Sequence, residues 1–175
     1  MKRKIKAITI GCIICILVAS TVAILTGVFG IPSNNVEQDA RKSQKIESTW
    51  KVSKSINSQL CAMIFYDDAL NDYTYSIYLN RAGLSFGYFF RSGGSNNAIM
   101  DGIHEFTYDA NGSALISMNK DKVAKIKLYD GKNMTTVNID PAKPFAAVIP
   151  MNCGSVTLYD VNGRVVPITV VEANG

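Results

Sequence analysis

The 175-residue sequence contains a single histidine, His104, and four cysteines. A metal site built from several imidazoles is therefore excluded, and the sequence predicts no cofactor. Cys12 and Cys15 lie in an apolar segment near the N-terminus, which leaves Cys61 and Cys153 for the rest of the chain. In an exported protein these two cysteines either form a disulfide or remain as two separate buried thiols, and the sequence leaves both alternatives open.

A surplus of positive charge is lacking from most of the chain. The formal net charge is +4, but the four basic residues of segment 1–6 account for it, because the other 14 basic residues balance 14 acidic ones. A protein that binds nucleic acid needs excess cations to displace counterions from phosphates. We therefore expect no nucleic-acid partner for the part of the chain that follows residue 6.

Charged residues are also missing from the segment Ala7–Phe29. A helix of this length would span about 35 Å, enough to cross a hydrocarbon core of roughly 30 Å. The basic residues before it predict a cytoplasmic N-terminus and an extracytoplasmic C-terminus, as in a single-pass protein of the cell membrane. A signal peptide cleaved near Val18–Ser20 is the alternative. The apolar run continues well beyond that point, which favours an uncleaved anchor.

The sequence divides into four expected parts, each with its own composition. These are a basic cytoplasmic tip (1–6), a transmembrane helix (7–30), a polar linker or short helix (31–48) and an extracytoplasmic β domain (49–175). Pro32 cannot continue the helix, which supports its end near residue 30.

Alternating apolar and polar residues predict strands from Trp50 onward. The almost wholly apolar segment Gln59–Tyr66 is typical of a central strand with both faces buried. Four later segments end in tyrosine and then Asp or Asn, followed by a glycine-containing turn and a second strand. Their tyrosines are Tyr78, Tyr108, Tyr129 and Tyr159. This is β-hairpin chemistry, because glycine supplies left-handed backbone and an Asp side chain can bind turn amides. The fold class predicted is all-β, an antiparallel β-sandwich or barrel-like ectodomain behind a single N-terminal transmembrane helix.

The aromatic run Tyr88–Phe90, followed by Arg91, is the candidate binding site of the sequence. Three successive rings cannot all face one side of a strand, so either both faces are covered or a ring is exposed. Exposed aromatic residues beside an arginine and a Gly/Ser/Asn-rich loop are common at binding surfaces. We name Tyr88, Phe90 and Arg91 as binding candidates. The alternative is a buried central strand followed by an ordinary loop.

Other motifs favour structural roles. The segments Asp109–Gly112 and Asp160–Gly163 resemble the openings of calcium loops, but Lys120 and Val171 stand where a glutamate ligand is required. We predict hairpin turns there and no metal site. His104 is next to Glu105 in a strand-like segment, so the two side chains point to opposite faces and form no local dyad.

Three segments carry a resemblance to a known group of proteins: Ser85–Ser95, Ile116–Lys120 and Val156–Gly163. In these segments the chain resembles uncharacterised small membrane-anchored exported proteins of Gram-positive bacteria. The likeness covers most of residues 58–168. It implies an anchored envelope protein and carries over no activity or catalytic residue.

The function expected from the sequence is that of a membrane-tethered extracytoplasmic binding or accessory module of the bacterial cell envelope, non-catalytic rather than enzymatic. Its partner would be another envelope protein, a peptide or a wall polymer. Two alternatives remain: an extracytoplasmic hydrolase that uses His104 or an acidic residue, and a subunit of a membrane sensor complex. The hydrolase requires a pocket that contains His104 or two neighbouring carboxylates.

Overall fold

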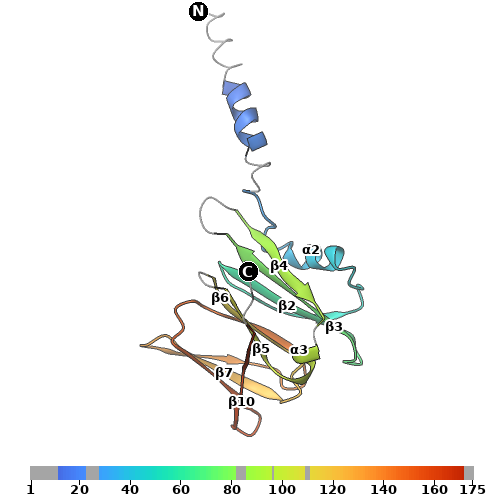
Figure 1. Cartoon of the computed structure of the whole chain (residues 1–175), viewed down its shortest axis with the longest axis vertical. Coiled ribbons are helices and arrows are strands. Elements are labelled where there is room, and N and C mark those ends of the chain that lie inside the picture. Colours follow the sequence, from blue (N-terminus) through green and yellow to red (C-terminus); the bar gives the residue numbers. More distant parts are fainter. Residues whose placement is uncertain (1–11, 23–27, 82–85, 96, 109–110, 172–175) are drawn as a thin grey trace, which may run out of the picture.

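The computed structural model describes residues 12–22, 28–81, 86–95, 97–108 and 111–171. Residues 12–22 are helical and stand apart from the sheets at one end of the long axis (Figure 1). The expected basic tip and residues 7–11 and 23–27 of the expected membrane helix lie outside the described residues. Residues 28–30, expected as the end of that helix, are not helical, because the backbone on both sides of Phe29 hydrogen-bonds to Phe86 and Phe29 itself forms a β-bridge with Phe86. Among the helices that are described, none combines the length and the hydropathy that membrane crossing requires.

The described part of the chain is mostly antiparallel β-structure, as predicted, and it forms three four-stranded sheets. In spatial order, the first sheet contains β1 (Lys51–Ile56), β2 (Leu60–Tyr66), β3 (Tyr73–Asn80) and β4 (Tyr88–Gly94). The second sheet contains β12 (Thr169–Val171), β5 (His104–Tyr108), β6 (Gly112–Ser117) and β9 (Phe145–Ile149). The third sheet contains β11 (Val165–Val166), β10 (Ser155–Asp160), β7 (Val123–Tyr129) and β8 (Met134–Asn138). Strands β12 and β5 are parallel, whereas all other pairs are antiparallel.

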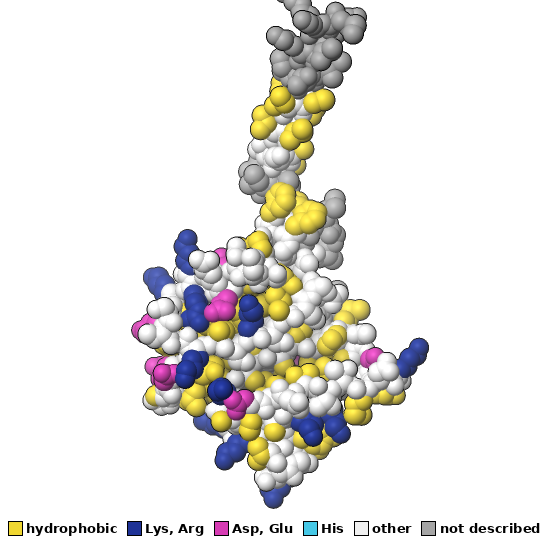
Figure 2. All heavy atoms as spheres, turned by 180° about the vertical axis from the view of Figure 1, so that it is seen from behind, with side chains coloured by type: hydrophobic (Ala, Val, Ile, Leu, Met, Phe, Trp, Pro, Cys, Tyr) yellow, Lys and Arg dark blue, Asp and Glu magenta, His cyan; other side chains and the backbone are white. Residues whose placement is uncertain are grey.

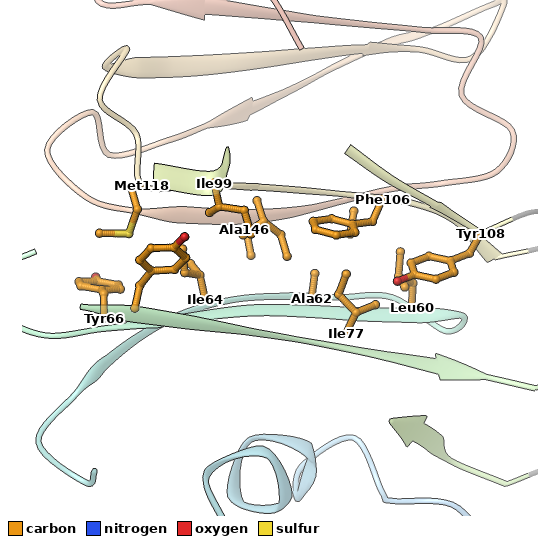
Figure 3. Packing of buried hydrophobic residues seen from close by; sticks show 13 residues of the cluster. Leu60, Ala62, Ile64, Tyr66, Ile77, Ile99, Phe106, Tyr108, Met118 and Ala146 are labelled. Carbon is orange, nitrogen blue, oxygen red and sulfur yellow. The ribbon is translucent and has the colours of Figure 1, made fainter. Parts of the chain in front are cut away.

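The first hydrophobic cluster fills the space between the first and second sheets. Figure 3 shows Ala62 and Ile77 of the first sheet opposite Phe106 and Ala146 of the second. Strand β2 alternates, so its even-numbered residues belong to this cluster and its odd-numbered residues to a cluster on the other face. Every residue of β2 is buried. The sequence-based prediction of a strand covered on both faces is therefore confirmed.

The second hydrophobic cluster lies between the second and third sheets. Leu115 on β6 and Phe145 on β9 pack there with Ile126 on β7 and Leu158 on β10. The neighbours of Leu115 along β6 belong to the first cluster instead. The second sheet therefore is the middle layer, with apolar side chains on both faces.

Helix α2 (Val36–Ser43) covers the outer face of the first sheet (Figure 1). It lies inside the segment expected as a polar linker or short helix. Val36 and Ala40 are both 0% exposed and pack in a third cluster with the odd-numbered residues of β2. The Tyr78 hydroxyl on β3 donates a hydrogen bond to Asp39 Oδ2 at 2.8 Å, which fixes the helix to the sheet. This segment is thus part of the folded body.

The predicted hairpin turns after Tyr129 and Tyr159 form as expected, whereas parts of the turns predicted after Tyr78 and Tyr108 lie outside the described residues. After β7, Asp130 Oδ1 accepts hydrogen bonds from the amides of Asn133 (2.7 Å) and Lys132 (2.8 Å). After β10, Asp160 Oδ1 accepts hydrogen bonds from the amides of Arg164 and Asn162, each at 2.8 Å. These backbone amides hold the pKa of both carboxyl groups below its ordinary value.

One local prediction was wrong. The Gly/Ser/Asn-rich stretch after Arg91 was expected to be a loop, but Gly93 and Gly94 are the last residues of β4. A short helix, α3 (Asn97–Asp101), follows, although residues 49–175 were expected to form a β domain. The side chain of Ile99 on α3 is 0% exposed and completes the first cluster. Tertiary packing therefore determines a helix that is too short to show a period in the sequence.

Candidate functional site

The three predicted binding residues do not form one surface. Tyr88 is only 7% exposed, and its hydroxyl donates a hydrogen bond to the Asn57 carbonyl. Burial raises the pKa of Tyr88 above its ordinary value. Phe90 is 51% exposed and rests edge-on against the ring of Tyr78, with centroids 5.5 Å apart. Tyr88 is thus a core residue, and Phe90 remains available for contact.

Arg91 is exposed at a β-bulge of the end strand β4. Ile77 pairs with Ser92 and Tyr78 pairs with Phe90, so Arg91 is the extra residue between them. Strand β4 is the last strand of the first sheet, which means that it is not the central strand considered as an alternative. Only Phe90 and Arg91 of the predicted set therefore remain at the surface.

His104 is buried in the middle layer. Its side chain is 4% exposed, and its backbone pairs with Ile116 on β6 and Thr169 on β12. Glu105 on the same strand is only partly buried and accepts a hydrogen bond from Ser113 Oγ at 2.5 Å. The two side chains point to opposite faces, as predicted, and therefore do not act on one substrate position.

A shallow groove lies between the β5–β6 hairpin and the loop after β9. Its volume is about 370 Å³, and its lining includes the Glu105 carboxylate, the Ser113 hydroxyl and Cys153. Among the described residues of this lining, Glu105 is the single carboxylate. The described lining of this groove therefore supplies neither His104 nor the two neighbouring carboxylates that the hydrolase alternative requires.

The two cysteines outside the apolar N-terminal segment lie in different clusters. Cys61 is buried beneath α2 in the third cluster, and Cys153 packs at the edge of the second. Both are free thiols. Of the two alternatives left open by the sequence, the structure has two separate thiols. The Cys153 thiol hydrogen-bonds to the Ser155 carbonyl at 3.2 Å.

A surface that the sequence reasoning missed is the outward face of the third sheet. Because Ile126 and Leu158 point into the second cluster, the alternating residues of β7 and β10 point outward. The strand register places three cross-strand rows side by side on this face. The rows are Met134–Tyr129–Ser155, Thr136–Lys127–Thr157 and Asn138–Lys125–Tyr159. We call this surface the lysine–tyrosine face.

The lysine–tyrosine face has an uneven charge. It carries Lys125 and Lys127, and none of its nine described positions is an aspartate or glutamate. The Lys127 ammonium lies 5.2 Å from the centroid of the Tyr159 ring, a cation–π distance. The nearest carboxylates along these strands, Asp130 and Asp160, accept hydrogen bonds from turn amides. A positive, hydroxyl-rich and aromatic surface therefore covers the third sheet.

A signal for this face was present in the sequence. Residues 125–129 and 155–159 both alternate with a period of two, and their outward positions hold Lys or Tyr in four cases. In the sequence, Tyr129 and Tyr159 indicate only the hairpin pattern. Which strands are neighbours is not visible in a single sequence, so the lysines and Tyr159 could not be placed together.

Within the described ranges, no group of three or more His, Cys, Asp or Glu side chains is arranged to hold a metal ion. Comparisons with protein-family models, with curated proteins and with solved structures found no match to this chain.

Proposed function

We propose that this chain is a membrane-tethered, non-catalytic binding module of the bacterial cell envelope, and that the lysine–tyrosine face is its ligand surface. The apolar run Ala7–Phe29 and the basic residues before it support the tether and its orientation. The stacking of three sheets through two apolar clusters supports the sandwich form of the expected ectodomain.

The observation that carries the proposal is the composition of the lysine–tyrosine face together with its position. Strands β7 and β10 lie at the end of the long axis opposite the helix of residues 12–22 (Figure 1). A chain tethered by that helix would therefore present this face away from the membrane. This is where a module of the envelope would meet a wall polymer.

The chemistry of the face favours an anionic polysaccharide as the ligand. Lys125 and Lys127 attract anionic groups, and no carboxylate on the face opposes them. The hydroxyls of Thr136 and Thr157 flank Lys127 and can donate to and accept from sugar hydroxyls. The Tyr159 ring offers apolar surface beside a polar edge. An open face of three strands also suits an extended polymer.

The test is binding of the full-length chain, kept in detergent micelles, to heparin as an anionic polysaccharide and to dextran as a neutral one. We expect heparin binding that weakens on the order of tenfold in the double variant K125Q/K127Q. The matched control is K42Q/K54Q, which removes the same charge from two exposed lysines elsewhere. An equal loss in both variants would show that only net charge matters and would refute the proposed face.

The hydrolase alternative depends on His104 reaching a substrate. Because its side chain is 4% exposed, the second sheet would have to open first. The sensor alternative needs a membrane partner, and crosslinking of the intact anchored chain in cells would identify one. Neither alternative is supported by a cluster of described residues comparable to the lysine–tyrosine face.

A further inference from the structure

The segment that follows the apolar run is bound directly to the start of β4. Gly30 N donates a hydrogen bond to the Phe86 carbonyl at 2.7 Å, and Ile31 N donates one to the Tyr88 carbonyl at 2.7 Å. In return, Tyr88 N donates to the Ile31 carbonyl and Phe86 N donates to the Val28 carbonyl, each at 2.8 Å. The exit of the apolar run is therefore a part of the sheet edge rather than a free tether.

Two glycines make this close contact fit. A Cβ atom on Gly30 would lie 2.7 Å from the Tyr88 carbonyl oxygen, and one on Gly87 would lie 2.7 Å from the Ile31 carbonyl oxygen. Gly87 also has a φ of +103°, which a residue with a side chain rarely adopts. Both segments therefore need glycine at the point where they meet.

The same contact brings two exposed aromatic rings together. Phe29 is 59% exposed and Phe86 is 60% exposed, and their rings are stacked with centroids 5.9 Å apart and planes 25° apart. Figure 2 shows hydrophobic side chains gathered where the helix of residues 12–22 approaches the sheets. Phe29 is also the last residue of the charge-free apolar run. Two large apolar side chains from distant parts of the sequence thus meet at one end of that run.

We propose that Phe29 and Phe86 insert together into the outer interface of the lipid bilayer and hold the first sheet against the membrane in a fixed orientation. The inference rests on the proposed membrane tether. The occupant is lipid because Phe29 is the last residue of the apolar run and Phe86 stacks on it, and aromatic rings are favoured at the membrane–water interface. The hydrogen bonds to Gly30 and Ile31 transmit the orientation of the anchor to β4.

The orientation has a direct consequence for the rest of the molecule. The pair lies beside the start of β4, which is near the helix of residues 12–22, whereas β7 and β10 of the lysine–tyrosine face are at the opposite end of the molecule (Figure 1). If the first sheet is docked on the membrane, the lysine–tyrosine face stays on the side of the molecule that is farthest from the membrane. A domain on a loose stalk would instead turn over and expose the face to the lipid surface for part of the time.

The experiment measures how deeply residue 86 lies in the bilayer. The full-length chain, with its single tryptophan removed by Trp50→Phe, is reconstituted into phosphatidylcholine–phosphatidylglycerol vesicles with or without brominated acyl chains. One variant adds Phe86→Trp, and the control adds Met134→Trp on β8, where the wild-type side chain is 61% exposed. We expect bromine to quench the tryptophan introduced by F86W at least roughly twofold more than the one introduced by M134W.

Flotation of the same vesicles distinguishes a failure of the membrane tether from a failure of the docking. Protein that does not float with the lipid contradicts the tether itself, and the docking with it. Protein that floats while both tryptophans are quenched equally little leaves the tether intact and overturns the docking. That second result is also expected if another protein or a second copy covers the pair. If circular dichroism shows that F86W does not fold, 4-fluorophenylalanine is incorporated at position 86 instead. Broadening of its ¹⁹F signal by a spin-labelled lipid would then show that residue 86 lies in the bilayer, and an unbroadened signal would overturn the docking.

Discussion

Ser55 on β1 accepts a hydrogen bond from the backbone amide of Val148 on β9, with 3.0 Å between Oγ and N. Two residues earlier on each strand, Ser53 accepts a hydrogen bond from the amide of Ala146 at 3.3 Å. Strand β9 is the last strand of the second sheet, so these amides have no partner among the described strands. Serine hydroxyls of the first sheet thus accept hydrogen bonds from backbone amides at the edge of the second sheet. These polar contacts link the two sheets beside their shared hydrophobic cluster.

We expect the double variant S53A/S55A to lose stability, because it leaves two partly buried amides without their acceptors. The free energy of unfolding should fall by about 1–3 kcal/mol in total. Urea denaturation followed by circular dichroism measures it. Ser155→Ala, at an exposed position on β10, is the control and should stay within about 0.5 kcal/mol of the wild type. Equal stabilities of the two variants would show that water satisfies the edge amides equally well.

The side chain of Asn119 hydrogen-bonds to the start of β7 and to the loop that contains Asp140 and Lys143. It is 5% exposed, and its Nδ2 atom lies within 3.1–3.2 Å of the carbonyl oxygens of Lys143, Val123 and Asp140. Its Oδ1 atom accepts a hydrogen bond from Val123 N at 2.7 Å. Its φ of +61° lies in the left-handed region, which asparagine tolerates better than most residues.

Asn119→Ala should lower the free energy of unfolding by about 2–4 kcal/mol, since it removes these bonds and strains the backbone. Asn119→Gly removes the same bonds but accepts the positive φ, so it should be less harmful by about 1 kcal/mol. Chemical denaturation of both variants separates the two effects. If the free energy of unfolding of both variants equals that of the wild type, the Asn119 side chain does not stabilise these loops.

The Tyr78–Asp39 hydrogen bond makes stability depend on alkaline pH. Burial, and after it the bond to Asp39, raises the pKa of Tyr78 above its ordinary value. Above pH of about 10, the unfolded chain releases the phenolic proton while the folded chain keeps it. The stability that Tyr78 contributes should therefore be constant below that pH and be lost above it.

Tyr78→Phe should make the alkaline decline in the free energy of unfolding less steep. Other groups with a raised pKa also contribute to that decline, namely Tyr75, Tyr88, Tyr108 and Cys61. The same variant should lose about 1–3 kcal/mol at pH 7, because a hydrogen bond to a carboxylate is removed. Urea titrations from pH 7 to pH 11 test both statements. If the free energy of unfolding falls with pH equally steeply in Tyr78→Phe and in the wild type, the pKa of Tyr78 is the same in the folded and unfolded states.

The free thiols of Cys61 and Cys153 should differ sharply in reactivity. Desolvation by burial raises the pKa of Cys61 to about 11, and its side chain is 0% exposed. Because the thiolate is the reacting form, iodoacetamide at pH 8 should modify Cys153 in the folded protein and Cys61 only after unfolding. Peptide mapping by mass spectrometry measures each site. A Cys61–Cys153 disulfide peptide under non-reducing conditions would contradict the structure.

Local chemistry made much of the secondary structure predictable. The alternation in residues 125–129 and 155–159 predicts strands, and Asp130 and Asp160 stand where turn amides need an acceptor. The apolar run that contains β2 correctly predicts burial on both faces. In each case the signal lies within a few residues of the element that it predicts.

What could not be predicted depends on distant neighbours. Tyr88 is buried because α2 covers that face of the first sheet, and nothing near residue 88 encodes the helix. Phe29 and Phe86 meet only because the chain returns to the edge of β4. The lysine–tyrosine face likewise needs β7 and β10 to be adjacent. A single sequence specifies periods and turns, whereas these surfaces depend on sheet order.

The parallel pairing of β12 with β5 determines the order in which the molecule can be completed. Thr169 lies beside His104, so the middle sheet keeps an open side while the whole intervening chain leaves the ribosome. A nascent or prematurely terminated chain would display the edge of β5 to its neighbours.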